Sequence, residues 1–270
     1  CSSPTSTPRC TRIGQRHLDT FVLFLRMPIS RVPHRLVLLG APGSGKGTYA
    51  KKIASKLSNI HSSLPIFSTG DLIRDEIKNQ TSLGQAAQKA SETGQLVPDD
   101  VVTSVVLARL EGFRETGYIL DGFPRTIAQA ESLSKYRNGE LNPTTVVNIN
   151  LATDVIVQKL AGRRVCTGCG TSYNLTSVVD VERGYDMPAM LPDDACLETL
   201  EIRKDDAKDV VQARLKVYEI ETAPLIGYYK EKDRLVDFVV KKGLKDLPML
   251  LKKIVKHQEL TRLAEQWAIP

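Results

Sequence analysis

The chain has 270 residues, of which 41% are hydrophobic and 25% are charged, as is ordinary for a soluble globular protein. Its net charge is +6, but six arginines and one acid precede Leu36, so the remainder carries 31 basic and 30 acidic groups. This near balance argues against nucleic acid as a partner. No apolar run approaches the roughly 20 residues that span a bilayer, which argues against a membrane protein.

Residues 1–34 are rich in Ser, Thr, Pro and Arg and almost free of acid. This composition is typical of an organelle transit peptide, so we expect import into the mitochondrial matrix or the plastid stroma. Two other interpretations are a disordered basic arm and translated sequence ahead of a start at Met27, both of which leave a cytoplasmic protein. Three of the five cysteines lie close together between residues 166 and 196, a clustering unlike a secreted disulfide framework.

The first predicted unit is a strand, a turn and a helix. The apolar run Leu36–Leu39 precedes the glycine-rich segment 40–48, and a helical stretch follows to about Leu57. Further short apolar strands separated by helical stretches are expected at Ile66-Phe67, Tyr118–Leu120, Val146–Ile149 and Leu235–Phe238. Strands spaced by helices predict an α/β fold: a parallel sheet flanked by helices, with ligands at the carboxyl ends of its strands. The glycine-rich segment after the first strand, whose spacing is given below, makes this a sheet of the P-loop NTPase type.

Two stretches interrupt this alternation and are predicted to be insertions at the ligand edge. One is helical and covers about 69–109, and the other covers about 165–204 and is rich in Gly, Pro and Asp. A long helix is expected to resume near Asp205, with Pro224 kinking or ending it. We therefore expect one domain over residues 35–257, followed by a tail over 258–270.

The glycine-rich segment has the spacing of a phosphate-binding loop. Gly40 and Gly45 are separated by four residues and Lys46 follows. Glycines let backbone N–H groups converge on phosphate oxygens, the next helix offers its positive N-terminus, and the lysine bridges the β- and γ-phosphates. The residue after the lysine is usually Ser or Thr, but here it is Gly47, and the hydroxyl comes one residue later at Thr48.

The sequence Gly-Ala-Pro-Gly-Ser-Gly-Lys-Gly-Thr resembles the phosphate loop of adenylate kinases, and the resemblance extends from Leu36 to about Tyr229. It implies reversible transfer of a phosphoryl group from ATP to AMP, giving two ADP, with Mg²⁺ accompanying the ATP. It also suggests a monomer. The residues it implies for ATP binding are Gly43, Ser44, Gly45, Lys46, Gly47, Thr48, Lys159 and Arg163.

Three further motifs resemble the family's acceptor site. They are Ser68–Arg74, Gly94–Asp99 and Leu120–Thr126. The resemblance implies that arginines hold the AMP phosphate, that Gln129 reads the adenine edge, and that Asp121 orders water around Mg²⁺. The residues implied for AMP binding are Thr69, Arg74, Val97, Gly122, Arg125, Gln129, Arg203 and Arg214. The segments 69–109 and 165–204 then correspond to the family's AMP-binding insertion and its lid.

Residues 161–164 and 203–206 resemble the lid hinges of the family. Converging guanidinium groups stabilise the charge of a transferring phosphoryl group without moving a proton. The residues implied for catalysis are Lys46, Asp121, Arg125, Arg163, Arg203 and Arg214. Asp205 and Asp206 are interpreted as orienting the arginines, or else as purely structural ion-pair partners.

One departure concerns the donor base. Lys159 stands where many family members place an arginine that stacks on the donor adenine, and lysine stacks poorly. A GTP:AMP phosphotransferase is therefore an alternative function. Less favoured alternatives are a uridylate-cytidylate kinase and a nucleotide-binding regulator without catalysis.

The cysteines of the lid suggest a structural metal site. Cys166 and Cys169 have the two-residue spacing that presents two thiolates to one tetrahedral ion, and Asp193 with Cys196 repeats that spacing. It resembles the zinc-binding lids of some adenylate kinases, and Asp194 is a substitute for Asp193. The alternatives are a zinc-free lid with incidental thiols and a Cys166–Cys169 redox pair.

Overall fold

The computed structural model describes residues 33–267 except 59–63, 82–83, 86 and 89–96. The predicted transit peptide therefore lies outside the described residues up to residue 32, as do residues 94–96 of one acceptor motif. The strands are β1 His34–Leu39, β2 Ile66–Ser68, β3 Gly117–Asp121, β4 Thr145–Asn150, β5 Arg163–Cys166, β6 Ser172–Asn174, β7 Val178–Asp180, β8 Tyr185–Met187, β9 Leu200–Glu201 and β10 Leu235–Val239.

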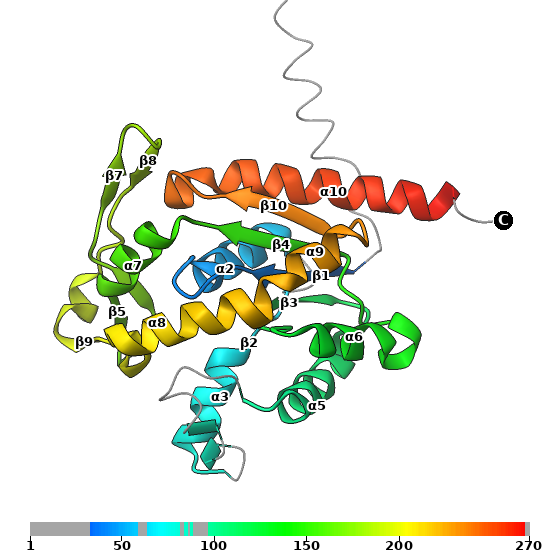
Figure 1. Ribbon diagram of the computed structural model, residues 1–270, viewed down its shortest axis with the longest axis horizontal. Coiled ribbons are helices and arrows are strands. Elements are labelled where there is room, and N and C mark those ends of the chain that lie inside the picture. Colours follow the sequence, from blue (N-terminus) through cyan, green and yellow to red (C-terminus); the bar gives the residue numbers. More distant parts are fainter. Residues whose placement is uncertain (1–32, 59–63, 82–83, 86, 89–96, 268–270) are drawn as a thin grey trace, which may run out of the picture. The chain divides into compact units, whose positions relative to one another are not determined.

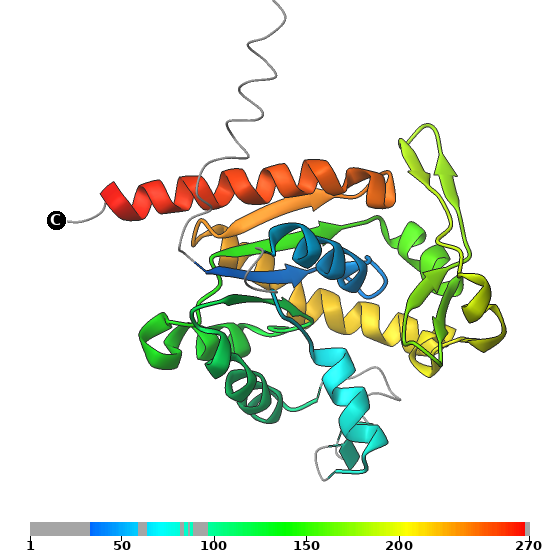
Figure 2. The same cartoon turned by 180° about the vertical axis from the view of Figure 1, so that it is seen from behind.

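The helices alternate with the strands of the main sheet (Figures 1 and 2). The α-helices are α2 Lys46–Leu57, α3 Thr69–Lys78, α5 Asp99–Leu110, α6 Ile127–Lys135, α7 Thr153–Ala161, α8 Lys208–Val217, α9 Pro224–Lys230 and α10 Leu247–Trp267. The shorter helical segments are η1 Glu111–Phe113, η2 Tyr136–Gly139, η3 Asp194–Thr199, η4 Lys204–Asp206, η5 Tyr218–Thr222 and η6 Gly243–Asp246.

The main sheet has the order β10-β4-β1-β3-β2, and all of its neighbouring strands are parallel. All five predicted strands are confirmed. Because both faces are covered by helices, alternate residues of one strand enter different cores: Leu36 and Leu38 pack with α2, α7 and α10, whereas Val37 and Leu39 pack with α5, α6 and α9. This explains the uninterrupted apolar run of β1.

The predicted lid contains two small sheets, β6-β5-β9 and β7-β8. Their buried side chains belong to different clusters. Cys166, Tyr173 and Cys196 form a cluster of their own, whereas Val178, Tyr185 and Met187 pack into the core that includes α7 and β10. The buried side chains of the hairpin β7-β8 thus join the main core, whereas those described for the cysteine-bearing sheet pack with one another.

The predicted long helix after Asp205 is present as three successive helical segments. α8 passes into the π-helical segment η5, and α9 follows with Pro224 in its first turn, where a missing N–H costs nothing. At the C-terminus, α10 crosses the expected domain boundary at residue 257, and Gln258 hydrogen-bonds the His34 ring at 3.0 Å. Among the described residues, no helix combines the length and apolarity that crossing a membrane requires.

Candidate active site

The loop between β1 and α2 presents unpaired backbone donors at a helix start. Gly45 is the N-cap of α2 and has φ 90, a left-handed conformation in which its side-chain-free backbone is unstrained. No side chain caps this helix. The first N–H groups of α2 therefore point to a place where an anion would satisfy them.

The ammonium of Lys46 lies on the same loop. Its Nζ donates to the carbonyl oxygens of Gly40 at 2.8 Å and Ala41 at 3.0 Å. Burial lowers the pKa of Lys46 to about 8; the opposing charge of Asp121 limits the shift, and the positive charge of Arg125 adds to it. A negatively charged phosphate oxygen at this position would stabilise the charged form of Lys46.

Asp121 ends β3 beside the loop, and Gly47 makes room for it. A Cβ placed on Gly47 would lie 3.1 Å from Asp121 Oδ2, tighter than ordinary contact. A side chain at this position would therefore require the Asp121 carboxylate to shift by a few tenths of an ångström. Burial raises the pKa of Asp121, while Lys46 and Arg125 oppose that shift.

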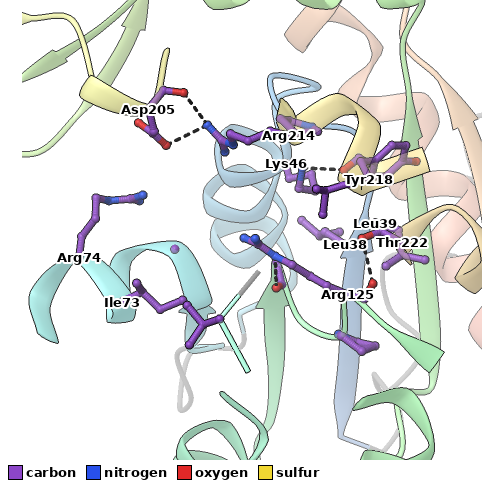
Figure 3. Close-up of a pocket in the computed structure, with 17 residues that line it drawn as sticks. Leu38, Leu39, Lys46, Ile73, Arg74, Arg125, Asp205, Arg214, Tyr218 and Thr222 are labelled. Carbon is purple, nitrogen blue, oxygen red and sulfur yellow. Dashed lines mark hydrogen bonds and ion pairs between the residues drawn. The ribbon is translucent and has the colours of Figure 1, made fainter. Parts of the chain in front are cut away.

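One cavity collects cations from four separate elements (Figure 3). Lys46 comes from α2, Arg74 from α3, Arg125 from the turn after β3, and Arg214 from α8. Their side chains point toward a shared space. Such convergence of positive charge is what a polyphosphate substrate requires.

Arg125 and Arg74, the two arginines predicted to hold the AMP phosphate, each make a hydrogen bond to a neighbouring residue. Arg125 Nε donates to the carbonyl oxygen of Gly122 at 2.9 Å, and burial lowers the Arg125 pKa to about 10. Arg74 is hydrogen-bonded to Asp71. Thr69 is 3% exposed and its Oγ1 has no hydrogen-bond partner among the described residues, so a water molecule or a ligand atom would satisfy it.

The hinge arginines pair with two consecutive carboxylates. Arg163 binds Asp206 through two nitrogens, with Nε to Oδ2 at 2.6 Å, and the Asp206 side chain is only 1% exposed. Arg214 Nη1 donates to Asp205 Oδ2 at 2.9 Å. Both predicted ion pairs are therefore present, as either interpretation of the two aspartates requires.

Of the remaining predicted residues, Arg163, Arg203 and Lys159 are not among those that line the cavity. Arg203 Nη2 donates to Ser172 Oγ at 3.0 Å, and neither Arg203 nor Arg163 lines the cavity. Lys159 Nζ donates to the carbonyl oxygen of Thr176 at 2.9 Å, so its ammonium is held by the lid segment. Val97 lines the cavity directly, as predicted for a base contact.

Gln129 is 2% exposed, and each end of its side-chain amide makes one hydrogen bond. Its Oε1 accepts from the backbone N–H of Arg125 at 2.7 Å, and its Nε2 donates to Asp99 Oδ1 at 2.7 Å. Asp99 was not predicted to have a side-chain role. No local pattern singles it out, because its partner lies 30 residues away.

Sequence reasoning also missed Tyr218 and Thr222, which line the cavity from η5. Thr222 Oγ1 donates to the backbone carbonyl of Arg125 at 2.9 Å and so supports that arginine's turn. The sequence predicted only a long helix here. The π-helical turn is a feature often found at functional sites, but the sequence does not disclose it.

The three thiols of the lid lie together. The Sγ atoms of Cys166, Cys169 and Cys196 are all within 4.8 Å of one another, and those of Cys169 and Cys196 are 3.6 Å apart. Asp193 is not part of this group; its backbone carbonyl accepts from the Cys196 N–H at 2.9 Å. The structure thus brings together three of the four predicted ligands.

Comparison with known proteins agrees with this geometry. The sequence model of the family described as adenylate kinase matches residues 38–234. The adenylate kinase of Lachnospira eligens is 43% identical over 201 residues, 73% of this chain and 88% of that protein. The adenylate kinase of Caldicellulosiruptor saccharolyticus is 40% identical over 225 residues, covering 82% and 97%. An Arabidopsis thaliana protein named probable adenylate kinase 6, chloroplastic, is 38% identical, covering 77% of this chain and 70% of its own length.

The chain belongs to the adenylate kinase family. It is accordingly a nucleoside monophosphate kinase that transfers a phosphoryl group to AMP, and the expected family, fold and enzyme class are confirmed. Adenylate kinases use Mg²⁺ together with their nucleoside triphosphate. A carboxylate at a strand end beside the P-loop, as Asp121 is, suits an oxygen-liganded ion of this kind.

Proposed function

We propose that the chain transfers the γ-phosphoryl group of ATP to AMP by electrostatic stabilisation and positioning. The observation that carries this proposal is the convergence of Lys46, Arg74, Arg125 and Arg214 on one cavity. Phosphoryl transfer places charge on the equatorial oxygens of the transferring group, and preorganised cations stabilise that charge. Lys46 and the loop residues 43–48 bind the donor, and Arg74 and Arg125 bind the acceptor phosphate.

The hinge arginines complete the assignment. Arg214 already lines the cavity. Arg163 and Arg203 would reach the phosphates when the cysteine-bearing part of residues 165–204 closes as a lid over the donor. Closure would exclude water and prevent hydrolysis of the triphosphate. On the acceptor side, residues 69–109 form the AMP-binding insertion, where Thr69, Val97 and Gln129 contact adenine and Gly122 allows close approach. Asp121 would orient water bound to Mg²⁺.

The donor base is assigned to adenine, with guanine as the alternative. Lys159 is bound to the Thr176 carbonyl, which leaves its ammonium poorly placed to stack on either base. A coupled assay of ADP formation separates the candidates: ATP with AMP should be the preferred pair, and CMP should be a poor acceptor. A preference for GTP as donor would replace the proposed function with GTP:AMP phosphotransfer, and no turnover with any pair would support a non-catalytic regulator.

We also propose that the lid cysteines bind a structural zinc ion, with Asp193 as the fourth ligand. Tetrahedral zinc with Zn–S bonds of about 2.3 Å places its sulfur ligands about 3.8 Å apart, close to the 3.6 Å between Cys169 and Cys196. Four protein ligands leave no open position, so the zinc would stabilise the folded lid and take no part in transfer.

Elemental analysis tests the zinc proposal. Protein purified without chelator should contain about one zinc per chain, and a Cys166→Ser Cys169→Ser variant should lose the metal and melt earlier. The matched control is Cys10→Ser, which should keep the metal. Substoichiometric zinc in the unaltered protein would favour the zinc-free lid.

We propose an organelle as the site of action. The basic, acid-poor leader supports this proposal, as does the word chloroplastic in the names of two Arabidopsis thaliana relatives. Residues 1–34 fused to a fluorescent protein should direct it into plastids or mitochondria. A diffuse cytoplasmic signal would instead support the basic-arm interpretation.

A further inference from the structure

We infer that Asp99 is a specificity-determining residue for the acceptor base, acting through Gln129. The inference rests on the proposed role of Gln129 in reading adenine. Asp99 starts α5, in the predicted AMP-binding insertion, and Gln129 lies in α6 of the core. Their contact therefore joins the two parts of the molecule that surround the acceptor base.

The surroundings of Gln129 allow only one orientation of its amide. A carboxylate only accepts hydrogen bonds, so the amide NH₂ must face Asp99; a backbone N–H only donates, so the amide oxygen must face Arg125. A flipped amide would place its oxygen against the Asp99 carboxylate and its NH₂ group against the Arg125 N–H. Both ends are buried, which makes such mismatches costly.

Asp99 is itself fixed by a second contact. Thr126 Oγ1 donates to Asp99 Oδ2 at 2.5 Å and accepts from the backbone N–H of Gln129 at 3.2 Å. The Thr126 hydroxyl oxygen accepts the Gln129 backbone N–H, and its single hydrogen is donated to the Asp99 carboxylate. Asp99, Thr126 and Gln129 are thus joined in a closed ring of hydrogen bonds at the start of α6, in which Gln129 takes part through both its backbone N–H and its side-chain amide.

The ring leaves the amide with one free N–H and one free lone pair. Two neighbours of this ring line the cavity: Arg125, whose N–H holds the amide oxygen, and Val97, which lies two residues before Asp99. Adenine has a donor at N6 beside an acceptor at N1, and hypoxanthine reverses this order with an acceptor at O6 and a donor at N1. An amide of fixed orientation suits one base and opposes the other.

Asp99 therefore contributes to the choice of AMP over IMP. Its removal leaves only the Arg125 N–H to orient the amide, so the inverted amide becomes more accessible. Such a change lowers the efficiency with AMP and raises that with IMP. A loss of local structure alone would lower both together, which makes the ratio of the two efficiencies the diagnostic quantity.

The experiment compares kcat/KM for AMP and IMP in Asp99→Asn and Asp99→Ala. Asparagine has the same shape but presents either an acceptor or a donor to Gln129. We expect the AMP-to-IMP ratio to fall about tenfold in Asp99→Asn and further in Asp99→Ala, with the KM for ATP unchanged. Asp100→Asn is the matched control, since Asp100 is an exposed acid in the same helical turn, and its ratio should stay within about twofold of the unaltered enzyme.

Measurements in a Gln129→Ala background separate the role of Gln129 in reading the base from the role of Asp99 in orienting Gln129. If Gln129 reads the base, Gln129→Ala loses the AMP preference and Asp99→Asn adds nothing to it. A Gln129→Ala enzyme that keeps the preference would reject the role proposed for Gln129. Loss of preference in Gln129→Ala, with the ratio unchanged in both Asp99 variants or with parallel losses for AMP and IMP, would overturn the inference about Asp99 alone.

Discussion

The P-loop and the lid hinge hold their cations in different ways. On the P-loop side, the Lys46 ammonium lies on two neutral backbone carbonyls. On the lid side, Arg163 and Arg214 are bound to the carboxylates of Asp206 and Asp205. A neutral partner is readily exchanged for phosphate, whereas a carboxylate keeps its arginine oriented through binding. The lysine thus has the exchangeable partners that a ligand-binding charge needs, and the arginine pairs are part of the folded framework.

Removing the lysine gives the sharpest functional effect with the least structural cost. In Lys46→Ala we expect kcat to fall about a thousandfold, equivalent to about 4 kcal/mol, while the melting temperature changes little. The physical reason is that, among the described residues, the hydrogen bonds of the ammonium go to carbonyl oxygens of its own loop. Steady-state kinetics and thermal denaturation measure both quantities. Lys51→Ala, an exposed lysine of the same helix, is the control, and turnover of Lys46→Ala within tenfold of normal would contradict the assignment.

Breaking the lid-side pair should show the opposite balance. Asp206→Ala leaves the guanidinium of Arg163, which is 18% exposed, without its carboxylate, and we expect a loss of about 3 kcal/mol of unfolding free energy in urea titrations. The exposed Glu131–Lys135 pair provides the control, with a loss below about 1 kcal/mol in Glu131→Ala. Equal effects of the two substitutions would show that the Arg163 pair has no framework role.

The smallest effect concerns pH and separates binding from stability at Lys46. As pH rises through its pKa of about 8, the free enzyme loses the ammonium charge, so kcat/KM for ATP should fall about tenfold by pH 9. Stability should change in the other direction. Between about 8 and 10.5 the unfolded chain binds the proton more tightly than the folded chain, so unfolding free energy rises with pH through this group.

The control for this prediction is Lys46→Arg, which stays charged throughout this range. Its kcat/KM for ATP should lack the decline above pH 8. An identical decline in both proteins would assign the titration to another group.

The P-loop side was predictable from sequence because its parts are adjacent in the chain. Leu36–Leu39, the glycines and Lys46 fall within one strand-loop-helix unit, and local spacing predicts it. Asp99 and Thr222 were not identified as structural partners because they act on residues 30 and 97 positions away. Such contacts depend on how α5, α6 and η5 pack, and no periodicity records that packing.

The segment 165–204 illustrates a second limit. It was predicted as one insertion, since its composition is uniformly rich in Gly, Pro and Asp. The structure divides it, because Tyr185 packs into the main core while Cys166 and Cys196 pack with each other. Strands of three residues carry too little alternation to show which core they join.

The attachment of β7-β8 has a practical consequence for measuring motion. Lys241 Nζ lies 3.9 Å from the Tyr185 ring centroid, and Lys245 binds Asp186 at 3.0 Å, so the hairpin is anchored to the segment after β10. A fluorescent label at Val181, which is 88% exposed near the hairpin tip, would serve as a stationary reference. A second label at the exposed Leu197, in the cysteine-bearing part, would then report closure as a change in energy transfer within the lid itself.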